Sequence, residues 1–330
     1  MNLVSLGIST LCYTISNMPK QNEIIVTGVN GFVGEHLARH LQASRFSVTG
    51  VGREATPNQS VAPYLDKYQQ ANLLSADQVN DLPLKHATAI IHLAGLASVA
   101  ESFDKPDLYK SGNAEMTGNL LNAAETQGFS GRVVAISTGA LYNPNQPMPL
   151  NEESETTEGS PYAIGKIRAE NVIKQHRTDG LDVVIVRPFN HIGPGQANGF
   201  LVPDLYDQLL KAQQSGSANI MVGNLATKRD YTDVRDIVTA YTELATTDTL
   251  AHDTYNVASG VSLSGFEILE YLQKAMKLES IESTIDQSKV RPTDAMNIVG
   301  DATRIKAELG WETHSTPETA INDFVARRQA

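Results

Sequence analysis

Short apolar segments alternate with amphipathic segments along most of the chain. The apolar segments predict strands at 23–28, 47–52, 87–95, 132–137 and 181–188. Amphipathic segments with a helical period lie between them, at 33–44, 106–127 and 161–178. Strands that are apolar on both faces and separated by helices are typical of a parallel sheet covered on both sides. The pattern therefore predicts an α/β fold built on a doubly wound parallel sheet.

The pattern changes after Pro188, where loops rich in Gly and Pro and shorter helices follow. This change predicts a smaller C-terminal α/β unit that completes a cleft beside the sheet. We expect the larger unit to span 22–187 plus about 228–258, and the smaller unit to span 188–227 plus 259–330. Residues 1–21 follow neither a strand nor a helix period, and we expect them to form a disordered extension.

The composition narrows the class of protein. The chain has 330 residues, 41% of them apolar and 19% charged, which excludes fibrous and disordered proteins and favours two packed units. The net charge of −11 argues against nucleic acid or an anionic membrane as a partner. No segment has the ~18 consecutive apolar residues of a membrane helix. The single cysteine, Cys12, excludes an intramolecular disulfide and a thiolate zinc site. We therefore expect a cytoplasmic protein without a metal site.

The sharpest motif is a G-x-x-G-x-x-G sequence that follows the first predicted strand and opens the first predicted helix. Glycines allow a tight turn and a close approach to a pyrophosphate, and the free amides at a helix N-terminus stabilise its charge. The motif predicts a dinucleotide site in a Rossmann-type sheet. Its expected contacts are Gly28, Asn30, Gly31, Phe32, Val33 and Gly34.

The choice between NADP(H) and NAD(H) depends on the end of the second strand. In NAD sites a carboxylate there binds the ribose 2′-hydroxyl, whereas an arginine accommodates a 2′-phosphate. Gly52 stands where the carboxylate is expected, and Arg53 offers a guanidinium fork. This arrangement favours NADP(H). NAD(H) stays possible if Glu54 binds the ribose instead.

Tyr162 and Lys166 supply the candidate acid–base chemistry. Residues four apart on a helix lie on one face, so the phenol and the ammonium are expected to be neighbours. An unperturbed phenol, with a pKa of ~10, is a poor catalyst at neutral pH. A nearby ammonium and a cationic nicotinamide ring favour the phenolate, so we expect Tyr162 to exchange a proton with a substrate oxygen.

The glycine spacing together with the downstream Tyr-x-x-x-Lys resembles the extended short-chain dehydrogenase/reductases, over about 22–328. The resemblance implies that Thr138 hydrogen-bonds the substrate carbonyl, with Ser137 as the second candidate. The resemblance also implies cofactor contacts at the ends of predicted strands and on the helix 106–127. These residues are Asn72, Leu73, Leu93, Ala94, Gly95, Asn113, Ser137 and Pro188. Several of these residues are explained equally well as ordinary strand ends that do not contact a cofactor.

Within that family, four segments resemble enzymes that act on nucleotide sugars, particularly the GDP-mannose dehydratase/reductase group. They lie at 187–208, 222–241, 255–260 and 291–311. The resemblance implies a nucleotide-sugar partner, and guanidinium groups suit the oxygens of its diphosphate. The implied substrate contacts, besides Thr138, are Asn190, Val202, Gly223, Asn224, Arg229 and Arg291.

The same resemblance narrows the reaction. Relatives that eliminate water need an acidic pair after the active-site Thr, and this chain has Gly139-Ala140 there. The expected activity is reduction of a 4-keto nucleotide sugar, with GDP-4-dehydro-6-deoxy-D-mannose and GDP-D-rhamnose as substrate and product. A 4-epimerase of UDP-hexoses with tightly bound NAD, and a non-catalytic dinucleotide sensor, are the alternatives. A homodimer formed through 106–127 and 161–178 is also implied.

Overall fold

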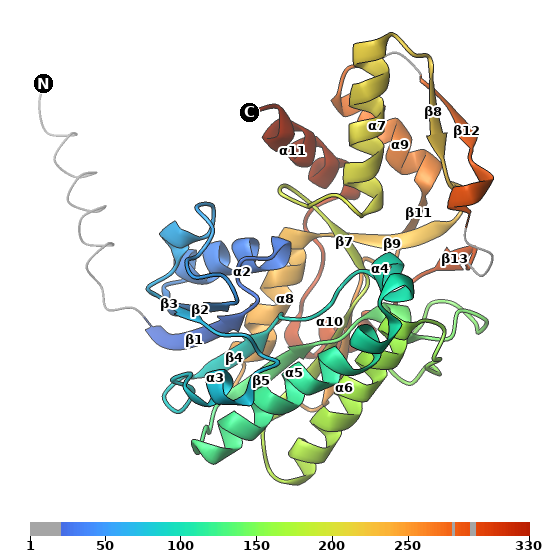
Figure 1. Cartoon of the computed structure of the whole chain (residues 1–330). Helices are drawn as coiled ribbons and strands as arrows, with labels where there is room; N and C mark the ends of the chain where they lie inside the picture. The colour runs from blue at the N-terminus through green and yellow to red at the C-terminus, as the bar shows by residue number, and fades with distance from the viewer. Residues whose placement is uncertain (1–20, 279–280, 291–294) are drawn as a thin grey trace, which may run out of the picture.

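The computed structural model describes residues 21–278, 281–290 and 295–330, so the expectation for residues 1–21 lies almost entirely outside the described residues. The predicted doubly wound parallel sheet is confirmed (Figure 1). Its strands are β1 (Gln21–Thr27), β2 (Phe46–Gly52), β3 (Lys67–Gln70), β4 (Ala89–His92), β5 (Arg132–Ile136), β6 (Val183–Pro188) and β10 (Thr254–Val257). They pair in parallel in the order β10-β6-β5-β4-β1-β2-β3.

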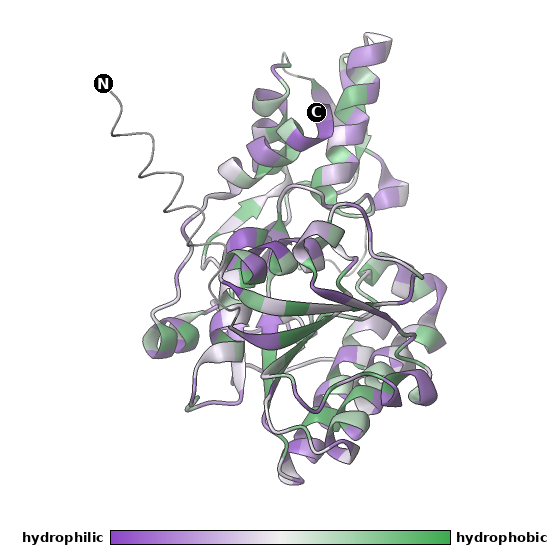
Figure 2. Cartoon of the chain, turned by 90° about the vertical axis from the view of Figure 1, so that its left-hand side faces the viewer, coloured by the Kyte–Doolittle hydropathy of each residue, from purple (hydrophilic) through white to green (hydrophobic). Residues whose placement is uncertain are grey.

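Helices cover both faces of this sheet. They are α2 (Phe32–Ala43), α3 (Ala76–Asn80), α5 (Pro106–Thr126), α6 (Pro161–Thr178), α8 (Val234–Thr246) and α10 (Thr303–Leu309), and the short α4 (Val99–Asp104) lies against α5 and α6. Helices α2, α8 and α10 pack on one face, and α3, α5 and α6 pack on the other. The molecule therefore has three layers, and in Figure 2 green segments are seen along the strands of the sheet while the helices around it carry both green and purple residues.

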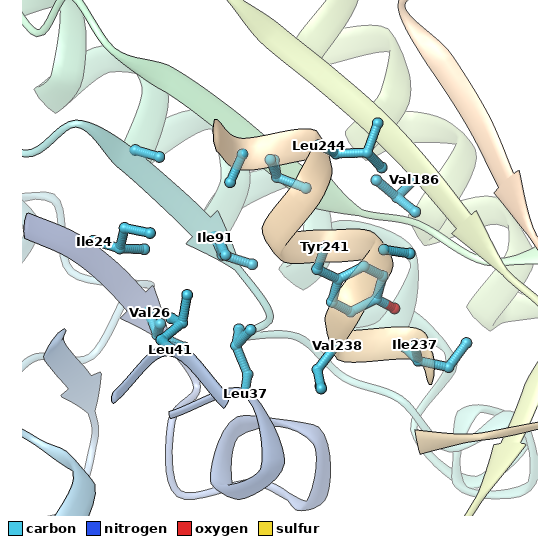
Figure 3. Packing of buried hydrophobic residues seen from close by; sticks show 14 of the residues in the cluster. Ile24, Val26, Leu37, Leu41, Ile91, Val186, Ile237, Val238, Tyr241 and Leu244 are labelled. Carbon is cyan, nitrogen blue, oxygen red and sulfur yellow. The ribbon is translucent and has the colours of Figure 1, made fainter. Parts of the chain in front are cut away.

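The side chains of the central strands alternate between the two cores. Ile24 and Val26 of β1 pack against α2 and α8, whereas Ile25 points to the layer of α5. This is the two-residue period of a strand that is buried on both faces. Figure 3 shows the first core, where the β1 side chains meet Leu37 of α2 and Val238 of α8.

A smaller unit stands at the upper right in Figure 1, beyond the sheet. Its strands are β7 (Asn190–Ile192), β8 (Asn219–Val222), β9 (Lys228–Asp233), β11 (Ser262–Ser264), β12 (Glu282–Ile285) and β13 (Asn297–Ile298). Its helices are α7 (Leu201–Ser215), α9 (Gly265–Ala275) and α11 (Pro317–Gln329). Strands β7, β11 and β13 pair with β9, and β12 pairs with β8, while the three helices share a third apolar core. The remaining short 3-10 turns are η1 (Ala62–Tyr64), η2 (Gly139–Leu141) and η3 (Gln287–Lys289).

Two elements differ from the expected boundaries between the units. Strand β9 pairs with the small sheet and not with the large one, so the return to the large unit begins at α8. Helix α10 and Trp311 pack into the core of the large sheet, although they follow the small unit in sequence. These contacts join segments that are distant in the chain. The assignment of one unit to the dinucleotide and the other to the substrate stays a prediction.

The strand order places its switch point at the carboxyl ends of β1 and β4. After β1 the chain continues to β2 on one side, and after β3 it crosses to β4 on the other side. Ligands of open α/β sheets bind at such a switch point, outside the carboxyl ends of the strands. The residues that follow β1, β4, β5 and β6 therefore converge at this edge.

Candidate active site

The turn after β1 has the geometry of a dinucleotide cradle. Gly28 has a φ of +70°, and a Cβ atom there would lie 2.8 Å from the backbone N and Cα of Ala94. Helix α2 begins at Phe32 with Gly31 as its N-cap, and that cap makes no side-chain hydrogen bond. The first amides of α2 are therefore available to an anion. The glycine turn and the uncapped helix fit the pyrophosphate of a dinucleotide, and Gly34 lets α2 pack against the turn, since a Cβ atom there would lie 2.4 Å from the Val29 carbonyl oxygen.

The end of β2 brings Asn30 and Glu54 together. Asn30 Nδ2 donates to Glu54 Oε2 at 2.8 Å, and this contact lowers the pKa of the Glu54 carboxyl. Gly52 lies below them, where a Cβ atom would be 2.6 Å from the Tyr68 hydroxyl. The side chain of Arg53 is exposed at the same edge. Asn30 thus reaches the carboxylate through its side chain, which the glycine pattern alone does not indicate.

Three predicted cofactor contacts form hydrogen bonds or core contacts within the protein itself. Asn113 of α5 is buried; its Oδ1 accepts from Leu96 N at 2.8 Å and its Nδ2 donates to Leu96 O at 3.1 Å. Asn113 therefore clamps the loop after β4 against α5. Asn72 lies beyond the end of β3, in a turn where its Oδ1 accepts from Leu74 N. Leu73 beside it is buried in the core.

The other predicted cofactor residues line the same sheet edge. Phe32 at the start of α2 stacks on His191 with ring centroids 6.1 Å apart. His191 is packed there and its Nδ1 lies 3.1 Å from the Phe189 carbonyl oxygen. Pro188 ends β6 in register with Val257 of β10. Of the remaining members of the predicted set, Val33 is in the first turn of α2, and Leu93, Ala94 and Gly95 follow β4.

Thr138, Tyr162 and Lys166 come together at the carboxyl end of β5. Tyr162 and Lys166 are buried on the first turns of α6, whose N-cap Ser160 accepts from Ala163 N. Thr138 caps η2 and hydrogen-bonds the Tyr162 phenol. Lys166 Nζ donates to the Ile136 carbonyl oxygen at 2.8 Å. The helix face predicted from the four-residue spacing thus reaches the hydroxyl at the end of β5.

Burial shifts the protonation equilibria of both Tyr162 and Lys166. Burial raises the pKa of the phenol above its ordinary value of 10.0, and the hydrogen bond from Thr138 opposes that rise only in part. Burial also lowers the pKa of Lys166 to about 8, against the raising influence of Glu170. In the protein alone the Tyr162 pKa is therefore raised, because desolvation of the buried phenolate outweighs the hydrogen bond, and the expected effect of Lys166 together with a bound nicotinamide ring stays a prediction. Tyr162 is a neutral phenol at neutral pH, which is the form that can donate a proton.

Ser137 is held by a buried ion pair. Its Oγ donates to Glu170 Oε1 at 2.6 Å. Arg187 donates to both carboxylate oxygens of Glu170, at 2.9 and 2.6 Å, and to the Tyr142 hydroxyl at 3.0 Å. Tyr142 in turn donates to Asn256 Oδ1 at 2.7 Å. Because the Ser137 hydroxyl already has this acceptor, the geometry favours Thr138 over Ser137 for a substrate carbonyl.

The predicted substrate contacts differ in how exposed they are. Asn190 is exposed where β7 begins, and Gly223 and Asn224 follow β8 in a half-buried loop. Val202 is buried in the core of the small unit, so its side chain is not open to a ligand. Arg229 Nη1 donates to the carbonyl oxygens of Lys228 and Ala295. Arg291 lies outside the described residues.

The family follows from a comparison with known proteins. The model of the NAD dependent epimerase/dehydratase family matches residues 24–258. The chain belongs to this family. The resemblance to extended short-chain dehydrogenase/reductases is thereby confirmed. A relative named GDP-6-deoxy-D-mannose reductase, from Pseudomonas aeruginosa, is 34% identical over 92% of this chain and 96% of its own length.

Further members of the family have different names. UDP-arabinose 4-epimerase 1 from Arabidopsis thaliana is 26% identical over 90% of this chain and 77% of its own length. The solved structure of RMD from Pseudomonas aeruginosa complexed with NADPH has a TM-score of 0.81 and 29% identity, covering 94% of this chain and all of the other. A family with reductases, epimerases and dehydratases fits the Tyr162–Lys166 site, since each of these chemistries moves a proton at a sugar oxygen or carbon.

Glu170 and Arg187 are the site residues that the sequence analysis did not assign. Glu170 lies one helical turn beyond Lys166 and two beyond Tyr162, on the same face of α6. That spacing is visible in the sequence. Its partner Arg187, however, is on β6, and only the fold brings the two together. In the described parts of the chain, no group of three or more His, Cys, Asp or Glu side chains is arranged to hold a metal ion. None of the described helices has the length and apolar character needed to cross a bilayer.

Proposed function

We propose that this protein reduces the 4-keto group of a nucleotide sugar, converting GDP-4-dehydro-6-deoxy-D-mannose to GDP-D-rhamnose with NADPH. The observation that carries the proposal is the buried Tyr162 phenol, which is hydrogen-bonded to Thr138 and lies on the helix that carries Lys166. The Nζ atom of Lys166 would lie 3.5 Å from a Cβ atom on Gly95, in the turn after β4. The relative named GDP-6-deoxy-D-mannose reductase, matched over nearly the whole of both chains, supports this choice of sugar.

The reaction adds a hydride to the carbonyl carbon and a proton to its oxygen. A bound NADPH supplies the hydride. Thr138 donates a hydrogen bond to the carbonyl oxygen and polarises it, and Tyr162 donates the proton that the new hydroxyl needs. The Lys166 ammonium stabilises the phenolate that Tyr162 leaves behind. The raised pKa of Tyr162 keeps the phenol protonated before the reaction begins.

Gly139 supports reduction over elimination of water. A Cβ atom on Gly139 would lie 3.0 Å from the ring of Phe189, so a carboxylate side chain at this position would require the ring to shift. Ala140 beside it carries no acid either. The site therefore lacks, directly after Thr138, the pair of groups that would remove one proton and deliver another to a leaving hydroxyl.

Epimerisation is the second candidate. Relatives named UDP-arabinose 4-epimerase and UDP-glucose 4-epimerase cover about nine-tenths of this chain. A 4-epimerase uses the same phenol and retains its NAD. Arg53 at the end of β2 favours NADPH and thus the reductase, because a guanidinium binds a 2′-phosphate through two hydrogen bonds.

A product assay tests the proposal. Purified protein is incubated with GDP-mannose and a GDP-mannose dehydratase, with or without NADPH, and the nucleotide sugars are analysed by mass spectrometry. We expect a product heavier than the keto sugar by two hydrogens, formed only when NADPH is present. Interconversion of UDP-hexoses without added cofactor, with no two-hydrogen gain, would establish the epimerase instead.

A further inference from the structure

Helix α6 forms hydrogen bonds with two successive residues at the end of β5. Lys166 donates to the carbonyl oxygen of Ile136, and one turn later Glu170 accepts from the hydroxyl of Ser137. The next residue, Thr138, bonds the Tyr162 phenol. Two consecutive turns of one helix therefore fix the strand end that carries the carbonyl-binding hydroxyl.

Glu170 is buried, with only 3% of its surface exposed. The guanidinium fork of Arg187, itself buried, donates to both of its oxygens. The Ser137 hydroxyl donates a third hydrogen bond to the same carboxylate. Three donors therefore fix the carboxylate inside the protein, two of them in a guanidinium–carboxylate fork.

Lys166 and Glu170 also line a common cavity of about 10 Å³, together with His92, Asn113 and Thr117. This volume holds about one water molecule, so both side chains have little solvent around them in the cavity. The charged and titratable neighbours of Lys166 come from three elements. Tyr162 and Glu170 are on α6, His92 is on β4, and Arg187 on β6 reaches Glu170. Burial lowers the pKa of His92 to about 3, so His92 is neutral.

We propose that Glu170 is a positioning residue for the Tyr162–Lys166 pair, whose buried carboxylate keeps the neighbouring Lys166 in its ammonium form. The role of this charge in turnover rests on the proposed reductase function; its effect on Lys166 does not. Without the carboxylate, burial would lower the Lys166 pKa further, and less of the ammonium form would be present when the phenolate needs an opposite charge. Arg187 and Ser137 hold Glu170 in place.

The direct test is the titration of Lys166 in the protein without substrate. Lysine labelled with ¹³C at Cε is followed by NMR from pH 6 to 10, and the Lys166 signal is identified by its loss in Lys166→Arg. We expect Glu170→Gln to lower the pKa of Lys166 by about one unit from its value near 8, because an opposite charge in a poorly solvated site is removed. An unchanged Lys166 titration in Glu170→Gln would overturn the proposal.

Two control variants separate charge from packing. Glu125→Gln removes a carboxylate that joins α5 to α6 through His176, far along the helix, and should leave the titration and the activity unchanged. Ser137→Ala removes the hydrogen bond to Glu170 but keeps its charge, so the Lys166 pKa should move by less than about 0.3 units. A shift in Ser137→Ala as large as that in Glu170→Gln would contradict the electrostatic role.

A third variant covers the case in which Glu170→Gln does not fold. Glu170→Asp keeps the carboxylate on a side chain that is one methylene shorter, so the pKa of Lys166 should fall below its wild-type value. An unchanged Lys166 titration in Glu170→Asp then counts against the proposal.

The pH profile of turnover gives the functional readout. In Glu170→Gln the high-pH decline of kcat should begin about one pH unit earlier, so that kcat at high pH falls about tenfold while kcat near pH 6 changes little. A uniform loss at every pH would indicate a merely structural role and contradict the proposal. If no reduction is found at all, the NMR titration still decides the effect on Lys166, and the failure belongs to the proposed function.

Discussion

The backbones of Gly28 and Ala94 lie in direct contact at the switch point of the sheet. A Cβ atom on Gly28 would stand 2.8 Å from both the N and the Cα of Ala94, and Gly28 has a φ of +70°. The turn after β1 is thereby fixed against the turn after β4. Both turns carry predicted contacts to the dinucleotide.

Replacing Gly28 with Ala should destabilise the fold and weaken dinucleotide binding. The left-handed backbone and the clash together predict a loss of about 2–5 kcal/mol in the free energy of unfolding. Gly128 is a matched control, since its φ is +68° and a Cβ atom there meets nothing within 4 Å. Gly128→Ala should lose only about 1–2 kcal/mol and bind NADPH normally. Equal losses in urea unfolding of the two variants would contradict the tight contact.

Removing the Tyr162 hydroxyl should abolish most of the turnover. General acid catalysis contributes about 10²–10⁴-fold, so Tyr162→Phe is expected to lower kcat by at least about 100-fold. Its dissociation constant for NADPH, measured by fluorescence titration, should stay within about threefold of wild type, because the ring that packs in the site remains. Tyr109→Phe removes a nearby buried phenol that donates to Glu101, and should keep kcat within a few-fold. Comparable losses in both variants would remove Tyr162 from the acid role.

Burial of Lys166 should cost the protein stability below about pH 8. The Lys166 pKa of about 8 in the folded protein lies below the ordinary lysine value of 10.5, so the folded state binds the proton more weakly than the unfolded state. The penalty, at most about 3 kcal/mol, is fully present below pH 8 and declines as the pH rises toward 10.5. Lys166→Met should therefore be more stable than wild type at pH 7.

The advantage of Lys166→Met in urea unfolding should shrink between pH 8 and pH 10. The conservative replacement Lys166→Arg keeps the buried charge and should show no such gain at pH 7. A constant difference between Lys166→Met and wild type across this range would show that the lysine titrates normally in the folded protein.

Arg53 should determine the preference for NADPH. A charge-assisted fork on the 2′-phosphate is worth about 1.5–3 kcal/mol, so Arg53→Ala is expected to lower kcat/KM for NADPH by about 10–100-fold and to leave NADH almost unchanged. Glu54→Gln, which keeps the hydrogen bond to Asn30 possible, should not reduce the use of NADPH. The opposite pattern, with a loss of NADH use in Glu54→Gln and none in Arg53→Ala, would assign the ribose to Glu54.

The expected contact between two subunits through α5 and α6 should extend to the exposed apolar residues at the start of α5 and on the neighbouring α4. Leu108 on α5 and Phe103 on α4 are large apolar residues that are 43% and 59% exposed. Leu108→Glu places a charge in this surface and should shift a dimer to a monomer in sedimentation velocity at micromolar concentration. Met221→Glu changes a similarly exposed residue on β8 and should leave the sedimentation unchanged. A wild-type monomer would contradict the expected homodimer.

The cofactor end of the fold could be predicted from the sequence because its signals are local. The alternation of apolar strands with amphipathic helices reports burial on both faces of a sheet, and it is encoded within a few residues of each position. The glycines after β1 are equally local, since a left-handed turn and a close approach need residues without a side chain. The four-residue spacing of Tyr162 and Lys166 follows from the helical period alone.

Tertiary structure alone decided what those residues meet. Asn113 hydrogen-bonds the backbone of Leu96, and Ser137 hydrogen-bonds Glu170. Both contacts form because the fold brings α5 and α6 against strand ends that are distant in the chain. Strand β9 pairs with β7, β11 and β13 instead of the large sheet. The sequence of its six residues does not indicate which sheet it joins. The pKa of Tyr162 rises because the phenol is desolvated in the assembled site. Periodicity records which side of an element is buried, whereas partners and protonation states depend on contacts between distant segments.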